Sequence, residues 1–423
     1  MGYLSRLIDR DLDELLPGLP AIALDGPKGV GKTETSARRA GSVVRLDDPD
    51  VALIARPDPT LVIKGPRPVL LDEWQHVPAV WDAVRRAVDA GAGSGSFLLT
   101  GSASPAAHGP VHSAAGRIAS LRMRPMIVSE RSGAASPTVS LSDMIEGRAE
   151  LGGESQLRLT DYVEEIVASG FPAIRGLPPR ARRVQLDGYL TRLFERDLPE
   201  ATGVTARRPA SLRAWLSAYA AATSTTASLE AIRAAATPGA ADPPSKVTTL
   251  RYRDWLTSMW LLDPVPAWRP PGAPLRRLIA APKHHVADPA LAARLLGVGA
   301  RDLRDGQGRT ILGQGPLLGA LFESLCAMSV RVIAQSLDAR VSHLRTQRGE
   351  REVDLIVEGD GGRVVGIEVK LTATVDAADV KNLHWLRSEL GAQVRDLVVL
   401  TTGSQAYRRA DGVAVVPLAL LGP

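Results

Sequence analysis

Short apolar runs alternate with helical patterns through the first part of the chain. Residues 21–25 (AIALD), 69–71 (VLL) and 97–100 (FLLT) are continuous apolar runs, the pattern of strands that are buried in a parallel sheet. Helical patterns cover residues 34–40 and 78–90 between them. Strands that alternate with helices predict an α/β domain built around a parallel sheet.

The middle of the chain has the spacing of helices. From residue 161 to residue 208, apolar side chains recur three and four positions apart, and we expect them in the core. Residues 211–268 contain three further helical patterns, with a proline-bearing break before the third and a short extended segment at the end. This order predicts a winged helix-turn-helix unit.

The third helix of that unit carries the candidate DNA contacts. Ser245 is placed to cap its amino terminus. Lys246, Arg251 and Arg253 lie on or near the helix that would enter a DNA groove. A helical packing unit without a nucleic-acid role is the alternative for this region.

A helix and a hairpin of charged strands dominate the carboxy-terminal part. Residues 316–336 predict an amphipathic helix with one carboxylate, Glu323, in an otherwise apolar stretch, where an unpaired buried carboxylate would be costly. The strand at 352–357 is joined by a Gly-rich turn to the strand at 364–370. These segments predict a second α/β domain.

Four charged side chains can meet on one face of this second domain. Glu368 and Lys370 are two residues apart on one strand, so they point to the same face, and Asp354 on the partner strand can reach them. Together with Glu323 they would bind Mg²⁺ and position a water for attack on a phosphodiester. The alternative is a fold kept for DNA binding or assembly, with an idle site.

A glycine-rich loop links the first predicted strand to the helix after it. The residues predicted to bind nucleotide are Gly26, Pro27, Lys28, Gly29, Val30, Gly31, Lys32 and Thr33. The glycines let successive backbone N–H groups surround a β-phosphate, and the helix amino terminus adds partial positive charge. Lys32 is expected to reach the β- and γ-phosphate oxygens, and the Thr33 hydroxyl to ligate Mg²⁺. The loop therefore predicts a site for ATP with Mg²⁺.

Polar residues at the ends of the next strands complete the predicted nucleotide site. Asp72 is expected to hold Mg²⁺ through water, and Glu73 to polarise the attacking water as a general base. Thr100 or Ser102 would hydrogen-bond the γ-phosphate or the water. Arg117 is a candidate to stabilise transition-state charge on a neighbour's nucleotide, and an ordinary surface position is its alternative.

Length and composition limit the number of domains and indicate where in the cell the protein lies. With 423 residues, 45% of them hydrophobic, we predict a nucleotide-binding domain at 1–150, a helical and winged-helix region at 151–270 and a carboxy-terminal domain at 271–423. Cys326 is the single cysteine, which excludes an internal disulfide. No stretch approaches the ~20 uncharged apolar residues of a membrane helix, so we expect no membrane partner and a cytoplasmic location. The net charge of +5 permits a polyanionic partner without requiring one.

The ordered set of motifs is similar to a known family. GPKGVGKT, VLLDEWQ, FLLTGSA and AGRIASLRMRPM resemble stretches of the AAA-type ATPases that carry a DUF4143 domain, relatives of the archaeal ATPase group of P-loop proteins. YVEEIVASGFPAIR, YLTRLFERDL, HHVADPALAARLLG and HLRTQRGEREVDLIVEG continue the match in the same order, so it covers nearly the whole chain. The carboxy-terminal part resembles the restriction-endonuclease-like fold, whose Asp, Glu-x-Lys and helix Glu match Asp354, Glu368, Lys370 and Glu323.

Two functions remain open from the sequence. The first is an oligomeric ATPase that binds and remodels or translocates DNA, of the helicase or branch-migration type, with a carboxy-terminal domain that grips or cuts branched DNA. Nucleotide sites that need a neighbour's arginine make a homo-oligomer the expected assembly. The alternative is an ATP-dependent switch that acts on a protein partner in a toxin–antitoxin, defence or signalling system.

Overall fold

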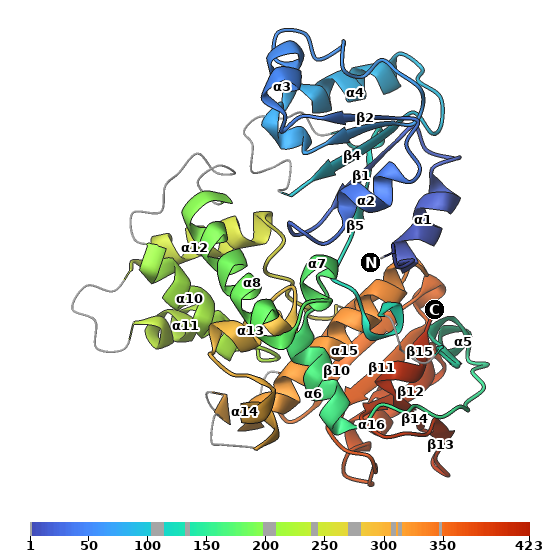
Figure 1. Ribbon diagram of the computed structural model, residues 1–423. Helices are drawn as coiled ribbons and strands as arrows, with labels where there is room; N and C mark the ends of the chain where they lie inside the picture. Colours follow the sequence, from blue (N-terminus) through green and yellow to red (C-terminus); the bar gives the residue numbers. More distant parts are fainter. Residues whose placement is uncertain are drawn as a thin grey trace.

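The computed structural model describes residues 2–102, 114–131, 136–197, 209–237, 244–269, 281–305, 310–311, 315–346 and 349–423. Figure 1 shows an amino-terminal sheet with its helices at the top, a group of helices to one side below it, and a second sheet at the bottom. In this view both termini lie near the junction between the upper and lower parts.

The amino-terminal sheet is parallel, with the strand order β2-β3-β4-β1-β5. Its strands are β1 (Ala21–Asp25), β2 (Ser42–Arg45), β3 (Val69–Asp72), β4 (Phe97–Gly101) and β5 (Ala119–Arg122). The helices of this part are α1 (Leu7–Leu15), α2 (Lys32–Ala37), α3 (Pro49–Ala55) and α4 (Ala79–Asp89). The α/β architecture predicted from the alternating runs is confirmed.

The interior strands of this sheet are buried on both faces. β1, β3 and β4 are buried along their whole length, as their continuous apolar runs predict. Alternate side chains of each strand enter separate cores, one shared with α1 and the other with α3 and α4. Because the strands are parallel, the ends that carry Asp25, Asp72 and Thr100 meet at one edge.

The middle of the chain forms two helical groups. The first contains α6 (Leu159–Ala168), α7 (Pro172–Arg175) and α8 (Pro179–Arg192), which continues as a π-helical turn at Leu193–Asp197. The second contains α10 (Pro209–Ala221), α11 (Leu229–Ala236) and α12 (Lys246–Ser258). Single bridges join Thr223 to His284, Leu262 to Val286 and Val265 to Lys283. The two antiparallel bridges, at Leu262 and Val265, form a short bridged hairpin after these helices. The winged-helix assignment of this region stays a prediction.

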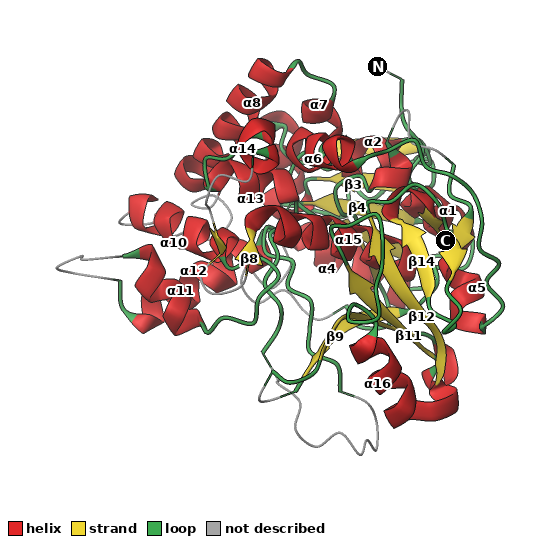
Figure 2. Cartoon of the chain, turned by 90° about the horizontal axis from the view of Figure 1, so that it is seen from below, coloured by secondary structure: helices red, strands yellow, loops and turns green. Residues whose placement is uncertain are grey.

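The carboxy-terminal sheet has the order β13-β14-β12-β11-β10-β9, with β9, β10 and β11 antiparallel and β11, β12 and β14 parallel. Its strands are β9 (Arg340–Arg345), β10 (Glu352–Glu358), β11 (Val364–Val369), β12 (Val394–Thr401), β13 (Tyr407–Arg408) and β14 (Ala414–Pro417). The helices are α13 (Pro289–Leu295), α14 (Ala300–Arg304), α15 (Leu317–Gln335) and α16 (Lys381–Leu390), and β7 (Thr310–Ile311) pairs with β8 (Gly315–Pro316). The apolar side chains of α15 and α16 enter separate cores on the two faces of the sheet, and Figure 2 shows α16 on its outer side.

Two segments pack with a different part of the protein than the predicted domain limits suggest. In the segment that the sequence analysis gave to the end of the 1–150 domain, β6 (Val139–Ser140) pairs with β15 (Leu421–Gly422), and α5 (Leu141–Glu146) packs on β11 and β12. Residues 281–305, assigned to the carboxy-terminal domain, pack on α6 and α10 through α13 and α14. A few buried apolar side chains decide both placements, and their number is too small to give a periodic pattern.

Helix α15 is the core helix of the carboxy-terminal part. By length and composition it is the kind of helix that can cross a membrane, but 67% of the apolar stretch is buried inside the protein. It packs against α6, α13 and β9. Its apolar surface is therefore explained by tertiary packing.

Candidate functional site

The glycine-rich loop connects β1 to α2 in a conformation that requires its glycines. Gly31 precedes α2 with φ of 110°, which is in the left-handed region. At Gly26 an added Cβ atom would lie 2.2 Å from the carbonyl oxygen of Met123. A larger residue at either position would displace the backbone, so the glycine pattern of the motif has a direct structural reason.

Lys32 is buried at the base of this loop. Its ammonium group donates hydrogen bonds to the carbonyl oxygens of Gly26 (2.8 Å) and Pro27 (3.0 Å). Burial lowers the pKa of Lys32 to about 8, and the nearby carboxylates of Glu73 and Asp25 only partly oppose this. The hydrogen-bond acceptors of Lys32 are thus neutral carbonyl groups, and the nearby carboxylates offset only part of the cost of burying its charge, which favours the binding of an anionic group.

The predicted metal ligands lie together at the sheet edge. Asp72 Oδ1 accepts hydrogen bonds from the Thr33 hydroxyl at 2.8 Å and from the Thr100 hydroxyl at 2.5 Å. The three side chains come from α2, β3 and β4, so the parallel pairing of β3 with β4 brings them to one point. A hydroxyl beside a carboxylate is a donor set that suits Mg²⁺.

Glu73 follows directly and turns away from the strand. Its φ is 51°, which is uncommon for a residue other than glycine and occurs at functional sites. Its Oε2 accepts hydrogen bonds from the Gln75 amide and from the Ser102 hydroxyl, the latter at 3.1 Å. Gln75 also donates to Ser102 at 3.1 Å. Gln75, which the sequence analysis did not single out, therefore helps to orient the Glu73 carboxylate.

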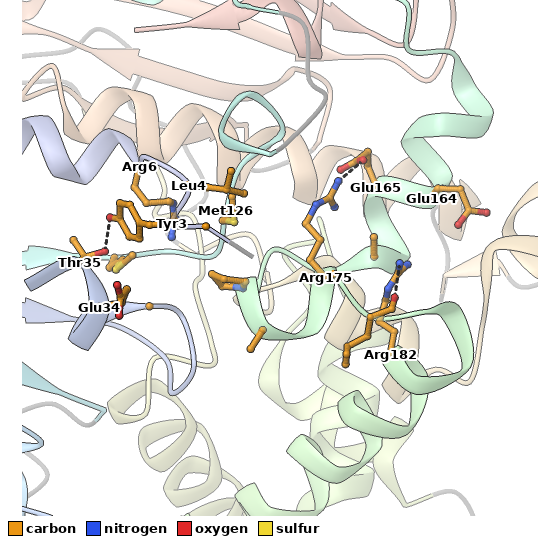
Figure 3. A pocket seen from close by; sticks show the side chains of 18 residues that line it. Tyr3, Leu4, Arg6, Glu34, Thr35, Met126, Glu164, Glu165, Arg175 and Arg182 are labelled. Atoms are coloured by element: carbon orange, nitrogen blue, oxygen red, sulfur yellow. Dashed lines mark hydrogen bonds and ion pairs between the residues drawn. The ribbon is translucent and has the colours of Figure 1, made fainter. Parts of the chain in front are cut away.

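A cavity of about 820 Å³ adjoins the loop (Figure 3). Gly31 lines it together with residues of the amino-terminal arm, including Tyr3 and Arg6. The Tyr3 hydroxyl lies 2.9 Å from the hydroxyl of Thr35 on α2, and Arg6 donates to the carbonyl oxygen of Val30 at 3.3 Å. The cavity has the size of a cofactor site and opens from the loop itself. Residues 2–6 have no recognisable motif, so this wall was not predicted.

The opposite wall of the cavity comes from α6, α7 and α8. Glu165 on α6 accepts from Arg175 on α7 at 2.6 Å and from the buried Arg131 at 2.5 Å. Figure 3 shows Arg175 beside Glu165 and places Arg182 of α8 farther along the same wall. This wall of the cavity is therefore formed by helices that lie outside the amino-terminal sheet.

A second lysine cluster lies between α15 and the carboxy-terminal sheet. Lys283, which is 1% exposed, contacts Glu323 of α15 at 2.9 Å, Glu352 at 2.8 Å and Asp354 at 2.9 Å, the latter two on β10. Burial alone would lower the pKa of Lys283, but Asp354, Glu323 and Glu352 together raise it well above its usual value. The predicted proximity of Glu323 to Asp354 is present, and Lys283 lies between them.

Glu368 and Lys370 lie next to this cluster. The Lys370 ammonium is 3.4 Å from Glu368 Oε2, and Asp354 Oδ2 accepts a hydrogen bond from the backbone N–H of Val369 at 2.9 Å. Glu368 is 4% exposed, and its Oε1 has no hydrogen-bond partner among the residues that the structure describes. Burial, reinforced by the charge of Asp354, raises the pKa of Glu368 well above its usual value. The four residues predicted from the sequence thus share one site.

Family descriptions match consecutive parts of the chain. "AAA domain" matches residues 19–132, which contain the loop, Asp72 and Glu73. The nucleotide-binding part is an AAA domain. "Domain of unknown function (DUF8612)" matches residues 159–302, and "Domain of unknown function (DUF4143)" matches residues 318–421. The predicted resemblance to AAA-type ATPases that carry a DUF4143 domain is confirmed at this level.

Similar proteins were found by sequence and by structure. Over 416 residues the chain is 28% identical to "Uncharacterized protein Rv2008c" of Mycobacterium tuberculosis and to "Uncharacterized protein Mb2031c" of Mycobacterium bovis, which covers 94% of this chain and 80% of each relative. The Walker-type ATPase Paby2304 of Pyrococcus abyssi has 14% identity and a TM-score of 0.40, covering 68% of this chain and 94% of that one. The ORC2 protein of Aeropyrum pernix has 16% identity and a TM-score of 0.29, covering 69% and 90%.

Arg117, which was predicted to act on a neighbour's nucleotide, lies at the surface of the AAA domain. Its guanidinium is half-exposed and pairs with Asp89 at the end of α4, at 2.8 Å. A neighbouring copy would have to replace that pair for Arg117 to reach another nucleotide. Its role in an assembly stays a prediction.

A buried ion cluster joins the AAA domain to the rest of the protein. Asp263, which follows α12, contacts Arg122 at 3.0 Å, Arg124 at 2.7 Å and Arg331 of α15 at 2.8 Å. Burial would raise the pKa of Asp263, but the three arginines lower it far below its usual value. Arg122 ends β5, beside Asp25 of the phosphate-loop strand. Arg122 therefore contacts the ion cluster through its side chain and pairs through its backbone with the strand that precedes the glycine-rich loop.

The predicted DNA contacts lie on α12 with different surroundings. Ser245 caps the helix by accepting from the Thr248 backbone N–H at 3.1 Å. Lys246 and Arg251 are exposed, whereas Arg253 pairs with the neighbouring Asp254 at 2.6 Å. Of the three cations, Lys246 and Arg251 are therefore better placed to contact a phosphate.

Proposed function

We propose that this protein is an ATP hydrolase whose AAA domain changes the conformation of a DNA-binding unit. The observation that carries the first half is the arrangement of Lys32, Thr33, Asp72 and Glu73 around one sheet edge. Lysine, a hydroxyl beside a carboxylate, and a second oriented carboxylate supply charge neutralisation, metal ligation and a general base. The adjoining cavity at Gly31 supports a nucleoside beside the phosphate loop.

Each residue has a separate task in the proposed hydrolysis. Thr33 and Asp72 would hold Mg²⁺, which supplies positive charge to the β- and γ-phosphate oxygens. Lys32 would leave the carbonyls of Gly26 and Pro27 and donate to phosphate oxygens. Glu73 would accept a proton as the water oxygen bonds to the γ-phosphorus and the bond to the β,γ-bridging oxygen breaks. ADP and phosphate are the products.

Two substitutions test the catalytic assignment. Lys32→Ala is expected to lower ATP hydrolysis on the order of 100-fold or more, because it removes charge stabilisation. Glu73→Gln is expected to lower turnover by a factor of roughly 10²–10⁴ while ATP binding is retained. Phosphate release and equilibrium binding of labelled ATP measure the two effects, with the exposed Lys64→Ala as the matched control in the same domain. Wild-type turnover in either variant would contradict the assignment.

DNA binding by the α10–α12 unit is the second half of the proposal. It is supported by the order of α10, α11, α12 and the bridged hairpin, and by the exposed cations Lys246 and Arg251 on α12. The ion cluster at Asp263 gives a physical route between this unit and the AAA domain. Remodelling or translocation of DNA would follow if ATP changes the strength of this binding.

Anisotropy of labelled linear, forked and four-way DNA tests this half. We expect binding that falls steeply with salt and that differs between the ATP-bound Glu73→Gln variant and nucleotide-free protein. The double change of Lys246→Ala and Arg251→Ala should weaken binding by roughly tenfold or more relative to the Lys381→Ala control. If no DNA of any topology binds or raises ATP turnover, this half of the proposal is lost.

The alternative to DNA binding is that the ATPase acts on a protein partner or on a second copy of itself. A group of exposed apolar side chains favours this alternative. Val43 of β2, Leu53 and Ile54 of α3, and Leu61 are exposed apolar side chains within one stretch of the AAA domain. Exposed apolar side chains on an edge strand and an adjacent helix favour an association surface. Light scattering of the ATP-bound Glu73→Gln variant tests self-association, with Leu53→Asp as the change expected to abolish it.

A further inference from the structure

The acidic cluster beneath α15 contains a buried amine supplied by another segment of the chain. Lys283 belongs to the strand-like segment bridged to Val265, and its side chain reaches across to α15 and β10. Its sequence separation from Glu323 is 40 residues and from Asp354 is 71 residues. The tertiary fold therefore builds this contact, by bringing Lys283 to one carboxylate of α15 and two of β10.

The geometry of this cluster is that of an ammonium group with all its donors used. A lysine ammonium has three N–H donors. Glu352, Asp354 and Glu323 each place a carboxylate oxygen 2.8–2.9 Å from the Lys283 nitrogen. Mg²⁺ ligands lie about 2.0–2.1 Å from the ion, with octahedral geometry. The position between the carboxylates is therefore filled by nitrogen, and these residues do not fit Mg²⁺ in this conformation.

The surrounding charges are consistent with a site that needs no further cation. Arg345 lies 3.6 Å from Glu352, and Lys370 lies 3.4 Å from Glu368. Glu368, buried with an unpartnered Oε1 among the described residues, is aimed at the same cluster through its interaction with Asp354. Lys283, Lys370 and Arg345 each lie within ion-pair distance of a carboxylate of the cluster.

We propose that Lys283 is a built-in cation that occupies the place of a divalent metal in the carboxy-terminal site. The site then binds no Mg²⁺ and performs no metal-dependent cleavage while Lys283 is in position. Lys283→Met removes the ammonium group and keeps a side chain of similar length. The carboxylates of Glu323, Glu352 and Asp354 then surround a position that holds no cation. Those oxygens are hard ligands, so a divalent cation is the natural replacement. This inference is independent of the ATP and DNA activities proposed above.

Mn²⁺ binding to the full-length, nucleotide-free protein tests the proposal. Electron paramagnetic resonance of free Mn²⁺ is compared for wild type, Asp354→Asn, Lys283→Met and the Lys283→Met/Asp354→Asn double variant. Mn²⁺ binding that is lost in Asp354→Asn is assigned to the carboxy-terminal site. Mn²⁺ bound at Asp72 does not depend on Asp354, so the two sites are distinguished. Lys381→Ala, an exposed lysine of the same part of the protein, is the matched control.

The outcomes separate cleanly. We expect no Asp354-dependent Mn²⁺ binding in wild type, and about one Asp354-dependent Mn²⁺ per chain in Lys283→Met. Folding of Lys283→Met that requires Mn²⁺, seen as a rise in Tm absent from the double variant, also supports the proposal. Asp354-dependent binding in wild type, or a folded Lys283→Met that gains none, overturns it. If Lys283→Met does not fold even with Mn²⁺, the wild-type comparison decides.

Discussion

Two buried lysines of this protein have opposite surroundings. Lys32 in the AAA domain is held by the neutral carbonyl oxygens of Gly26 and Pro27, and burial lowers its pKa to about 8. Burial also acts to lower the pKa of Lys283 in the carboxy-terminal part, but its carboxylate neighbours raise that pKa well above the usual value. Both side chains are at most 5% exposed, so burial by itself does not distinguish them.

The two lysines differ in their partners: Lys283 is already paired with carboxylates, whereas the hydrogen-bond acceptors of Lys32 are neutral. Lys32 gains favourable interactions when an anionic phosphate arrives, because its present acceptors carry no formal charge. Lys283 would lose carboxylate contacts if a ligand displaced it. The first lysine therefore marks a site for an anionic ligand, and the second completes a site from within the chain.

The largest expected effect is on stability and separates the two lysines. Lys283→Ala leaves buried carboxylates without their cation, which should lower the free energy of unfolding by about 3–5 kcal/mol. Lys32→Ala removes a desolvated amine held by neutral acceptors, so the nucleotide-free protein should lose little or gain slightly. Urea unfolding at pH 7 measures both. Equal losses in the two variants would contradict the distinction.

A smaller effect on the free energy of unfolding is expected when the pH is lowered, through His285. Burial, reinforced by the charge of Lys283, lowers the pKa of His285 to about 3. Because the folded pKa is below the unfolded value of about 6.5, this group contributes stability above pH 6.5 that is lost as the pH falls toward 3. At pH 5 the loss is about 2 kcal/mol. Urea unfolding at pH 7 and pH 5 should show a weaker pH dependence in His285→Gln, and an identical dependence would remove His285 from the account.

Nucleotide affinity should depend on pH through Lys32. In the free protein its pKa is about 8, and bound phosphate oxygens would raise that value by supplying anions. Binding above pH 8 therefore takes up a proton, and affinity should fall by up to about tenfold per pH unit, whereas it should change little through this group below pH 7. Calorimetry at pH 9 in two buffers of different ionisation enthalpy measures the proton uptake. Uptake that persists in Lys32→Ala would assign it to another group.

The smallest effect is expected at Arg117. Its ion pair with Asp89 is partly exposed, and such pairs contribute little. Arg117→Ala should therefore change the unfolding free energy by less than about 1 kcal/mol. A drop in ATP turnover in this variant, with stability unchanged, is the result that a role on a neighbour's nucleotide requires.

Prediction from the sequence succeeded where the signal is local. The phosphate loop needs glycines at Gly26 and Gly31 for steric and dihedral reasons, so the fold of that segment follows from adjacent residues. Asp72 and Thr100 could be placed together because each ends a buried strand of the same parallel sheet. The clustering of Asp354 with Glu368 followed from the hairpin.

Prediction did not reach contacts between distant segments. Lys283 follows a stretch with no charge pattern that points to α15, and Tyr3 and Arg6 precede the first helix in an arm without a motif. The packing of residues 136–158 on the carboxy-terminal sheet was likewise missed. In each case a few side chains form contacts whose partners lie tens of residues away or more.

The amino-acid sequence alone determined a glycine-rich loop at the edge of a parallel sheet, since glycine dihedrals, strand burial and side-chain alternation are short-range properties. Only the tertiary structure decided which cation faces Glu323 and Asp354 and what closes the cavity beside Gly31. Charge compensation depends on distance in space, and the chain brings Lys283 there through packing that no local pattern encodes.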